Sequence, residues 1–383
     1  MRRFFNPFIL ALSLILVLAY TYLAISLTSS SGGRAALALP FLCIWIVPFR
    51  YWGADKGEQT GVDEVIHFAA YLSMGWLNFI FFLTLFRDLW LILANAMEWS
   101  RWQELLLDPG TEVVLAASFF ALSVGLIAAL RGPIIKTIDI PIADLHPALE
   151  GYRIVQISDL HASSIIRERY VKRVVEMANS LDGDMIALTG DLVDGSVKHL
   201  ASTVAPLAEL VPRDRAYVIM GNHEYYSGAK PWIDHFRGMG FRVLLNDYVD
   251  LNHKGAAIRV GGVVDPAARS FQPPENPRPD LAAGPDASDR PDMFRLLLAH
   301  NPKLAAAAAP CGFHLQLSGH THAGQFFPWT LAVRMVHAPH VAGLSRQDKM
   351  WVYVNAGTGT WGPPLRFGTK PELTLIRLVR GSA

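Results

Sequence analysis

Cysteine and charge are both scarce in this sequence of 383 residues. Its two cysteines, Cys43 and Cys311, lie far apart in unlike surroundings, which excludes a disulfide framework and a cysteine-based zinc site. Only 17% of the residues are charged and 51% are hydrophobic, a balance too apolar for an ordinary soluble protein. A net charge of +1 offers no basic patch of the kind that nucleic acid requires, so we expect no nucleic-acid partner.

Long uncharged stretches account for much of the apolar excess, and they lie in the first 130 residues. Residues 8–27 are twenty residues without a charge, enough to cross a hydrocarbon core of about 30 Å. Further apolar stretches follow at residues 35–49, 65–86 and 113–130. We therefore predict a transmembrane region at 1–130 with about four helices, and an interfacial helix in the tryptophan-containing segment 87–110. Cleavage of the first stretch as a signal peptide stays open as an alternative.

Basic residues between these stretches predict the orientation in the membrane. With four spans and a cytoplasmic N-terminus, six basic residues fall inside and three fall outside, which favours a catalytic half on the cytoplasmic side of a cell inner membrane. The six are Arg2, Arg3, Arg50, Lys56, Arg131 and Lys136, and the three are Arg34, Arg87 and Arg101. The apolar stretches carry few charges, so the simplest role for this multi-pass region is an anchor in the bilayer.

The composition changes after residue 130. Residues 131–150 are predicted to be a linker with an edge strand, and residues 151–383 an α/β domain in which short apolar strands alternate at first with helices near 167–180, 198–210 and 229–239. Strands are predicted at 152–158, 185–190, 216–221, 257–263, 294–299, 313–318, 351–357 and 372–378. The Pro- and Asp-rich segment 265–292 has no periodicity and is predicted to be a mobile excursion.

Polar residues recur directly after the apolar strands of this domain. Because the carboxyl ends of strands in an open α/β sheet form the crevice where ligands bind, we expect these residues to converge. Carboxylate, amide and imidazole groups together suit zinc, manganese or iron(II), and they exceed the needs of one ion, whereas two ions sharing a carboxylate use them well. The residues are Asp159, His161, Asp191, Asp194, Asn222, His223, Glu224, His300, His320 and His322. If 320–322 is extended, alternation points His320 and His322 into the crevice together.

The order of these motifs, D-x-H, G-D-x-x-D, G-N-H-E, a single histidine and G-H-x-H, resembles the calcineurin-like metallophosphoesterase superfamily across residues 159–322. The resemblance implies a four-layer α/β/β/α sandwich that holds two divalent ions, Mn, Zn or Fe, about 3.5–4 Å apart. It implies one ion bound by Asp159, His161 and His322, a second bound by Asn222, His300 and His320, and Asp191 bridging both.

The resemblance also implies roles beside the metals. His223 would protonate the leaving oxygen or stabilise charge, Glu224 would orient the His223 imidazole, and Asp194 would support the site from behind the ligands. The nucleophile would be a hydroxide held between the ions. Arg366, in the glycine-rich segment 357–366, is a candidate phosphate contact, with a structural surface role as the alternative.

The leading functional prediction is a membrane-anchored phosphohydrolase that cleaves a phosphodiester or pyrophosphate bond. The segments 299–302 and 357–366 resemble a membrane-associated bacterial branch that includes phosphodiesterases and UDP-2,3-diacylglucosamine hydrolases. A bilayer anchor makes a lipid-linked phosphorylated substrate attractive. Two alternatives stay open: a membrane receptor or transporter-associated protein with a regulatory phosphoesterase domain, and a phosphoprotein phosphatase.

Overall fold

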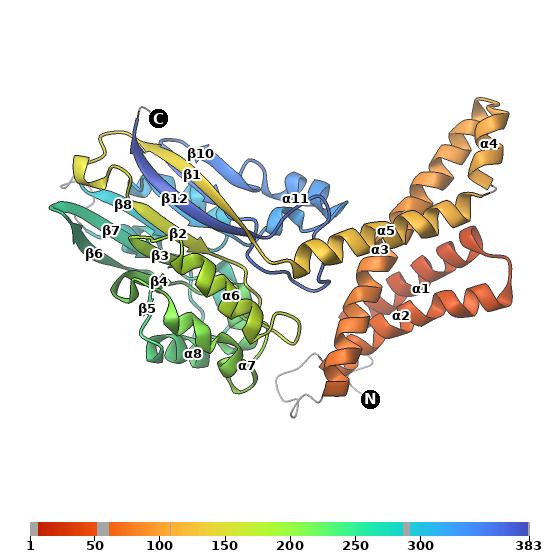
Figure 1. The fold of residues 1–383 in the computed structure, drawn as a ribbon, viewed down its shortest axis with the longest axis horizontal. Helices are drawn as coiled ribbons and strands as arrows, with labels where there is room; N and C mark the ends of the chain where they lie inside the picture. Colours follow the sequence, from red (N-terminus) through yellow and green to blue (C-terminus); the bar gives the residue numbers. More distant parts are fainter. Residues whose placement is uncertain (1–6, 52–60, 108, 286–291, 382–383) are drawn as a thin grey trace. The chain divides into compact units, whose positions relative to one another are not determined.

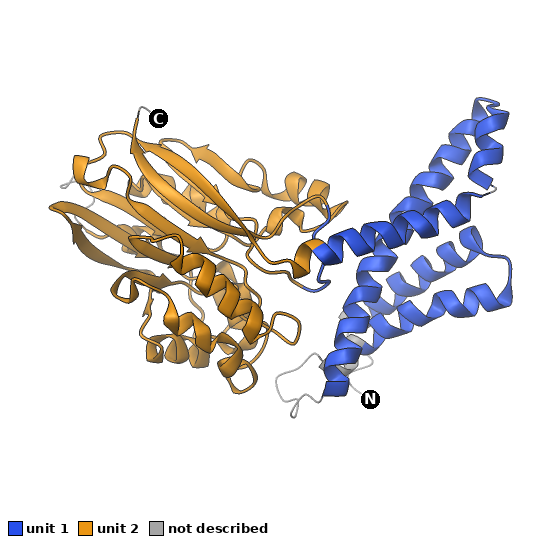
Figure 2. Cartoon of the chain, in the orientation of Figure 1, with its two compact units in different colours: residues 1–127, 362–367 blue, residues 128–361, 368–383 orange. Residues whose placement is uncertain are grey.

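The computed structural model describes residues 7–51, 61–107, 109–285 and 292–381 (Figure 1). The chain forms two compact units (Figure 2). One contains residues 1–127 together with 362–367, and the other contains residues 128–361 together with 368–383. The units are described separately below.

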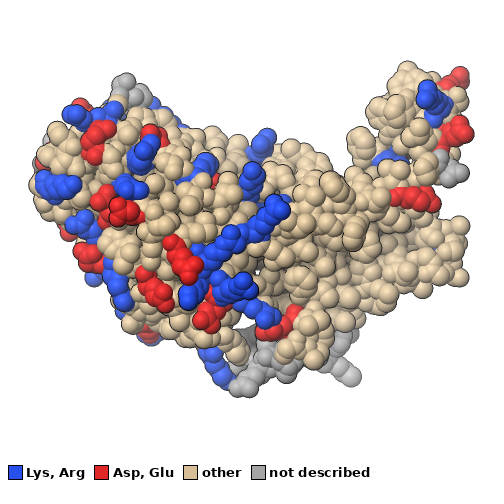
Figure 3. Space-filling model, in the orientation of Figure 1, with Lys and Arg blue, Asp and Glu red and all other residues tan. Residues whose placement is uncertain are grey.

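The helical unit contains α1 (Pro7–Leu27), α2 (Ser31–Tyr51), α3 (Gly61–Ala96), α4 (Ser100–Leu107) and most of α5 (Gly110–Leu130). Among the described residues, three helices are long and apolar enough to cross a membrane: Ile9–Leu27, Gly61–Ala96 and Gly110–Leu130. The predicted span 35–49 lies in α2, whose described apolar part, Ser31–Ile46, is shorter, so a fourth span stays a prediction. On the face in Figure 3, this unit shows mostly uncharged residues.

The predicted interfacial helix at 87–110 is wrong as a single element. Residues up to Ala96 continue α3, and only Ser100–Leu107 forms a separate short helix, α4. The tryptophans of this segment meet at the turn between the two helices, where the Trp90 ring lies 6.2 Å from Trp99 and 5.9 Å from Trp102 between centroids. The helix α3 is 36 residues long, whereas about 20 residues suffice to cross a bilayer.

Residues 362–367 pack among the membrane helices although they are far from them in sequence. The Leu365 side chain is fully buried, and a Cβ added at Gly75 of α3 would lie 2.2 Å from its Cδ1. The Arg366 N–H donates to the Gly125 carbonyl of α5 over 2.9 Å, and the Phe367 ring packs edge-on against Phe79. We had predicted that this segment belongs to the α/β domain. It instead packs in the helical unit, where Gly75 leaves room for the Leu365 side chain.

The α/β unit is built on two six-stranded mixed sheets. The first has the order β1 (Ile134–Ile142), β12 (Glu372–Arg380), β2 (Arg153–Ile157), β3 (Met185–Leu188), β4 (Ala216–Val218) and β5 (Arg242–Val243). The second has the order β10 (Gly343–Gln347), β11 (Met350–Val354), β9 (Leu315–Ser318), β8 (Phe294–Leu298), β7 (Ala256–Gly262) and β6 (Asp247–His253). Neighbours from β2 to β5 run parallel, as do those from β7 through β8 and β9 to β11.

Every strand predicted in the α/β domain is present, and β1 is an edge strand. The strands β5, β6 and β10 lack a continuous apolar run and were not predicted, since β6 and β10 are largely half-exposed. The helices are α6 (Glu168–Asn179), α7 (Val197–Val204), α8 (Asn222–Gly238), α9 (Pro279–Ala283), α10 (Ala305–Ala308) and α11 (Trp329–His337).

Alternate residues of the first sheet pack into two different apolar clusters. In β3, Met185 and Ala187 join a cluster that includes residues of the second sheet, whereas Ile186 and Leu188 join one that includes residues of α6 and α8. Burial on both faces explains why the strand reads as a continuous apolar run. A third cluster lies between the second sheet, α9 and α10.

The segment predicted to be a mobile excursion is ordered as far as residue 285. It forms a 3-10 helix at Pro266–Ser270 and the helix α9, in which Pro279, Ala282 and Ala283 are buried. Residues 286–291 lie outside the described part of the chain. The low periodicity was misleading because these short helices, each with proline in the first turn, bury only one and three residues.

Candidate metal centre

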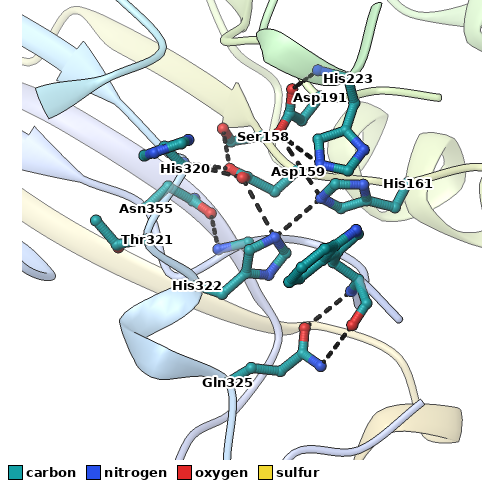
Figure 4. Close-up of polar contacts among 12 residues, drawn as sticks. Ser158, Asp159, His161, Asp191, His223, His320, Thr321, His322, Gln325 and Asn355 are labelled. Atoms are coloured by element: carbon teal, nitrogen blue, oxygen red, sulfur yellow. Dashed lines mark hydrogen bonds and ion pairs between the residues drawn. The ribbon is translucent and has the colours of Figure 1, made fainter. Parts of the chain in front are cut away.

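The polar motifs converge because they follow parallel strands of both sheets. Asp159 and His161 come after β2, Asp191 comes after β3, and Asn222 opens α8 after β4. From the second sheet, His300 follows β8, while His320 and His322 follow β9. Figure 4 shows side chains from both sheets pointing toward one another at this edge.

The backbone at this edge is turned sharply. Five of the predicted ligands have positive φ values between 50° and 72°, a region that residues other than glycine rarely occupy: Asp159, His161, Asp191, His320 and His322. Such conformations cost free energy and persist where the surrounding structure imposes them, typically at functional sites. The turns direct donor atoms of neighbouring residues into one small volume.

Two glycines allow the motifs to approach each other. A Cβ at Gly319 would lie 2.0 Å from Asp159 Oδ2, and a Cβ at Gly221 would lie 2.1 Å from Asp191 Oδ1. Any larger residue at either position would displace a carboxylate of the site. The glycines of the G-H-x-H and G-N-H-E motifs are therefore needed because a side chain does not fit at either position.

The first donor group consists of Asp159, His161 and His322, which are all buried. The Nε2 atoms of His161 and His322 lie 2.9 Å apart, and His322 Nε2 lies 3.4 Å from Asp159 Oδ1. Asp194 Oδ1 accepts from His161 Nδ1 over 2.9 Å and so keeps the proton on that nitrogen. The lone pair of His161 Nε2 therefore points at the other two donors, an arrangement that a cation stabilises.

The second donor group consists of Asp191, His300 and His320. His300 Nδ1 lies 2.8 Å from the Thr189 carbonyl, which can only accept, so Nδ1 carries a proton and Nε2, 3.0 Å from Asp191 Oδ2, is the atom that could bind a metal. Asn222 Oδ1 adds an oxygen 3.0 Å from His320 Nδ1. Burial would lower the pKa of His300, but the Asp191 carboxylate raises this pKa well above its usual value.

Asp191 lies between the two groups. Its Oδ2 is 3.0 Å from His300 Nε2 and 4.0 Å from His161 Nε2, so one carboxylate oxygen faces donors of both groups. Burial would raise the pKa of Asp191, but the neighbouring histidines lower it overall. Oxygen and nitrogen donors without thiolate, arranged in two groups around one carboxylate, fit two divalent ions.

Several known proteins are similar to this chain in sequence. Residues 152–324 match the calcineurin-like phosphoesterase family. Over 367 residues the chain is 31% identical to a Danio rerio transmembrane protein with metallophosphoesterase domain. This match covers 91% of this chain and 83% of the Danio rerio protein. A Bos taurus protein of the same name is 33% identical, and the match covers 73% of this chain and 64% of the Bos taurus protein. An uncharacterised Helicobacter pylori metallophosphoesterase is 34% identical, and the match covers 67% of this chain and 66% of that protein.

This chain belongs to the calcineurin-like phosphoesterase family. It is therefore a metallophosphoesterase, a hydrolase of phosphoric esters, and its family implies divalent metal ions at the two donor groups. Because the Danio rerio protein matches 91% of the chain, the similarity extends from the phosphoesterase domain into the apolar helices. Together with the lengths of these helices, this makes the chain a membrane protein.

Beside the two groups of this phosphoesterase lies His223, on the first turn of α8. Its Nδ1 is 2.7 Å from Asp194 Oδ1, and its Nε2 is 4.0 Å from Asp191 Oδ2. Burial would lower the pKa of His223, but the charge and hydrogen bond of Asp194 raise it to about 9. The His223 side chain is 17% exposed, so a ligand in solution can reach it.

The role expected for Glu224 is wrong. Its carboxylate is fully buried and accepts four backbone N–H groups: those of Asp191, Leu192, Val193 and Gly221, at 2.6–3.1 Å. The carboxylate that contacts His223 Nδ1 is Asp194 instead. Burial, the largest cause, raises the pKa of Glu224 to about 7. Glu224 thus holds the Asp191 turn against the start of α8.

Two other expectations need correction or stay open. Residues 320–322 are not extended, since His320 has φ 72° and Thr321 has φ −80° and ψ −21°, so simple alternation does not orient the two histidines. They nevertheless fall in different donor groups. Arg366 is 1% exposed and belongs to the helical unit, and its contact with a phosphate stays a prediction.

Several residues around the site were not predicted. The Ser158 hydroxyl donates to Asp159 Oδ2 over 2.5 Å. The rings of Tyr226 and Trp361 contact the His223 ring, at centroid distances of 5.5 and 5.8 Å, and the Gln325 side chain binds the backbone of Trp361. Their positions within or next to the G-N-H-E, G-H-x-H and glycine-rich segments were the only signal in the sequence.

Proposed function

We propose that this protein is a membrane-anchored, dinuclear metal-dependent phosphohydrolase that cleaves a phosphodiester or pyrophosphate bond. The observation that carries the proposal is the pair of donor groups around Asp191, with the partly exposed His223 imidazole held by Asp194 at the same edge. A site that only bound metal for structural reasons would not require a partly exposed imidazole that a carboxylate of the site holds in place.

The residues divide between the two ions as their contacts suggest. One ion would be held by Asp159, His161 and His322, the other by Asn222, His300 and His320, with Asp191 shared. When bound, two such ions, whether Mn, Zn or Fe, supply an activated water and neutralise charge on the phosphoryl oxygens.

The chain's own residues would perform the proton transfer. His223 Nε2 lies 4.0 Å from Asp191 Oδ2 while Nδ1 is held by Asp194, so a proton on Nε2 would be available to the oxygen of the leaving group. The Asp194 carboxylate stabilises the imidazolium before the transfer and retains the Nδ1 proton after it. Asp194 also orients His161, so one carboxylate positions both a ligand and the acid.

The apolar helices support a substrate that resides in the membrane. An anchored enzyme meets membrane-borne molecules at high effective concentration, which favours a phospholipid or a lipid-linked nucleotide such as those cleaved by UDP-2,3-diacylglucosamine hydrolases. We place the enzyme in the cell inner membrane with the phosphoesterase domain on the cytoplasmic side, as the basic residues suggest if four spans are present. We also propose a four-layer α/β/β/α arrangement, in keeping with the three apolar clusters of this unit.

The test is hydrolysis by the purified full-length protein in detergent. With Mn or Zn added, we expect hydrolysis of bis-p-nitrophenyl phosphate and two metal ions per chain by mass spectrometry. His300→Ala should lose both metal and activity, whereas His199→Ala, at an exposed position of α7, should retain them. Absence of hydrolysis from metal-loaded protein on diester, pyrophosphate and monoester substrates would reject the proposal.

A further inference from the structure

Two exposed aromatic side chains flank His223. Tyr226 is 64% exposed and Trp361 is 54% exposed, yet both rings contact the His223 imidazole in tilted, edge-on geometry, with interplanar angles of 64° and 76°. Single exposed hydrophobic residues are ordinary on protein surfaces. Two of them against the same imidazole of a metallophosphoesterase are a feature of the site.

The position of Trp361 is imposed by Gln325. The Trp361 N–H donates to Gln325 Oε1 over 2.8 Å, and Gln325 Nε2 donates to the Trp361 carbonyl over 2.9 Å. Gln325 itself is 6% exposed and has φ 55°, three residues after His322. A buried amide in an unfavourable backbone conformation thus holds an exposed ring beside the site, which indicates that the ring's position matters.

The Tyr226 ring packs against the segment 265–292, which was expected to be mobile. The ring lies 6.2 Å from that of Phe271, which follows the 3-10 helix Pro266–Ser270. Tyr226 belongs to the same helix as His223, three residues further along α8, so the two side chains lie on one face of the helix. The two aromatic rings are thus carried by separate segments of the chain, α8 and the glycine-rich segment after β11.

We propose that Trp361 and Tyr226 form a subsite for a planar ring on the leaving group, with Gln325 as a positioning residue. This inference rests on the proposed function, since it takes His223 as the acid that protonates the leaving oxygen. The group attached to that oxygen must then lie next to His223, where both rings are exposed. Aromatic side chains bind planar rings such as nucleobases or aryl groups by stacking, without hydrogen-bond selectivity.

The experiment compares two phosphodiesters whose leaving groups have matched acidity, one aryl and one fluoroalkyl. In Trp361→Ala of the full-length, Mn-loaded protein, kcat/KM for the aryl substrate should fall roughly 5- to 100-fold, mainly through KM, because stacking on one aromatic ring is lost. The fluoroalkyl substrate should change less than about twofold. Trp361→Phe should restore part of the difference, and Gln325→Ala should reproduce it with the ring still present.

Trp329→Ala is the matched control, since Trp329 is similarly exposed, at 50%, but lies on α11. Metal content and melting temperature are measured for each variant, and Trp361→Phe provides the answer if Trp361→Ala is unstable. Equal losses on both substrates, no loss on either, or a selective loss on long-chain alkyl esters would each overturn the subsite. If the metal-loaded wild type hydrolyses neither these diesters nor any pyrophosphate or monoester substrate, the proposed function fails instead.

Discussion

Replacing Glu224 with glutamine distinguishes two roles for this residue. The motif suggested that Glu224 orients His223, whereas the structure shows it binding backbone N–H groups on both sides of the Asp191 turn. If the structural role is correct, Glu224→Gln should destabilise the protein and lower its metal content. Its effect on turnover per bound metal should be small.

The magnitude follows from the four hydrogen bonds. Oε2 accepts the N–H groups of Asp191 and Gly221, and Oε1 accepts those of Leu192 and Val193. Glutamine has one oxygen and one amide group, so in either orientation two backbone donors face another donor. Each buried donor left without an acceptor costs about 1–3 kcal/mol, which gives a loss of about 2–6 kcal/mol. For a domain of this size, the melting temperature should fall by at least about 4 °C.

The assay is thermal unfolding of the full-length protein in detergent, with metal content measured on the same samples. Glu176→Gln, at an exposed position of α6, is the control and should melt with the wild type. Asp194→Asn should show the complementary pattern, with kcat at saturating Mn reduced roughly 10- to 100-fold because the support of His223 and His161 is lost. A Glu224→Gln variant with wild-type melting and metal but strongly reduced kcat would refute the reasoning.

Three further predictions concern single residues. His223→Ala should still bind two metal ions by mass spectrometry while kcat falls roughly 10²- to 10⁴-fold; loss of the metal would contradict its role as an acid. Gly319→Ala should lower metal content, since its Cβ would lie 2.0 Å from a carboxylate oxygen of the first donor group, while Gly238→Ala, where a Cβ meets nothing within 4 Å, should not. Leu365→Ala should destabilise the helical unit by about 2–5 kcal/mol in thermal unfolding, whereas Leu331→Ala, 52% exposed, should leave the melting temperature unchanged.

Much of the fold and of the candidate site could be predicted because the relevant signals are local. Burial on both faces makes each central strand a continuous apolar run, and the donors follow those strands directly. Six of the residues that the motifs name gather in the two donor groups: Asp159, His161, Asp191, His300, His320 and His322. The short helices near Pro266 and Pro279 could not be predicted, because each buries too few residues to leave a period in the sequence.

Which atom meets which partner was decided by the tertiary structure. Asp194 reaches His161 across 33 residues and takes the place expected for Glu224, the immediate neighbour of His223. Gln325 reaches Trp361 across 36 residues, and residues 362–367 join helices at the opposite end of the sequence. The sequence by itself determined which polar residues follow each strand, which donor atoms they offer to a metal, and where the apolar helices lie. These features depend on local composition and spacing. Positive φ values at the strand ends and contacts between distant turns set the directions of the side chains, and no local pattern encodes them.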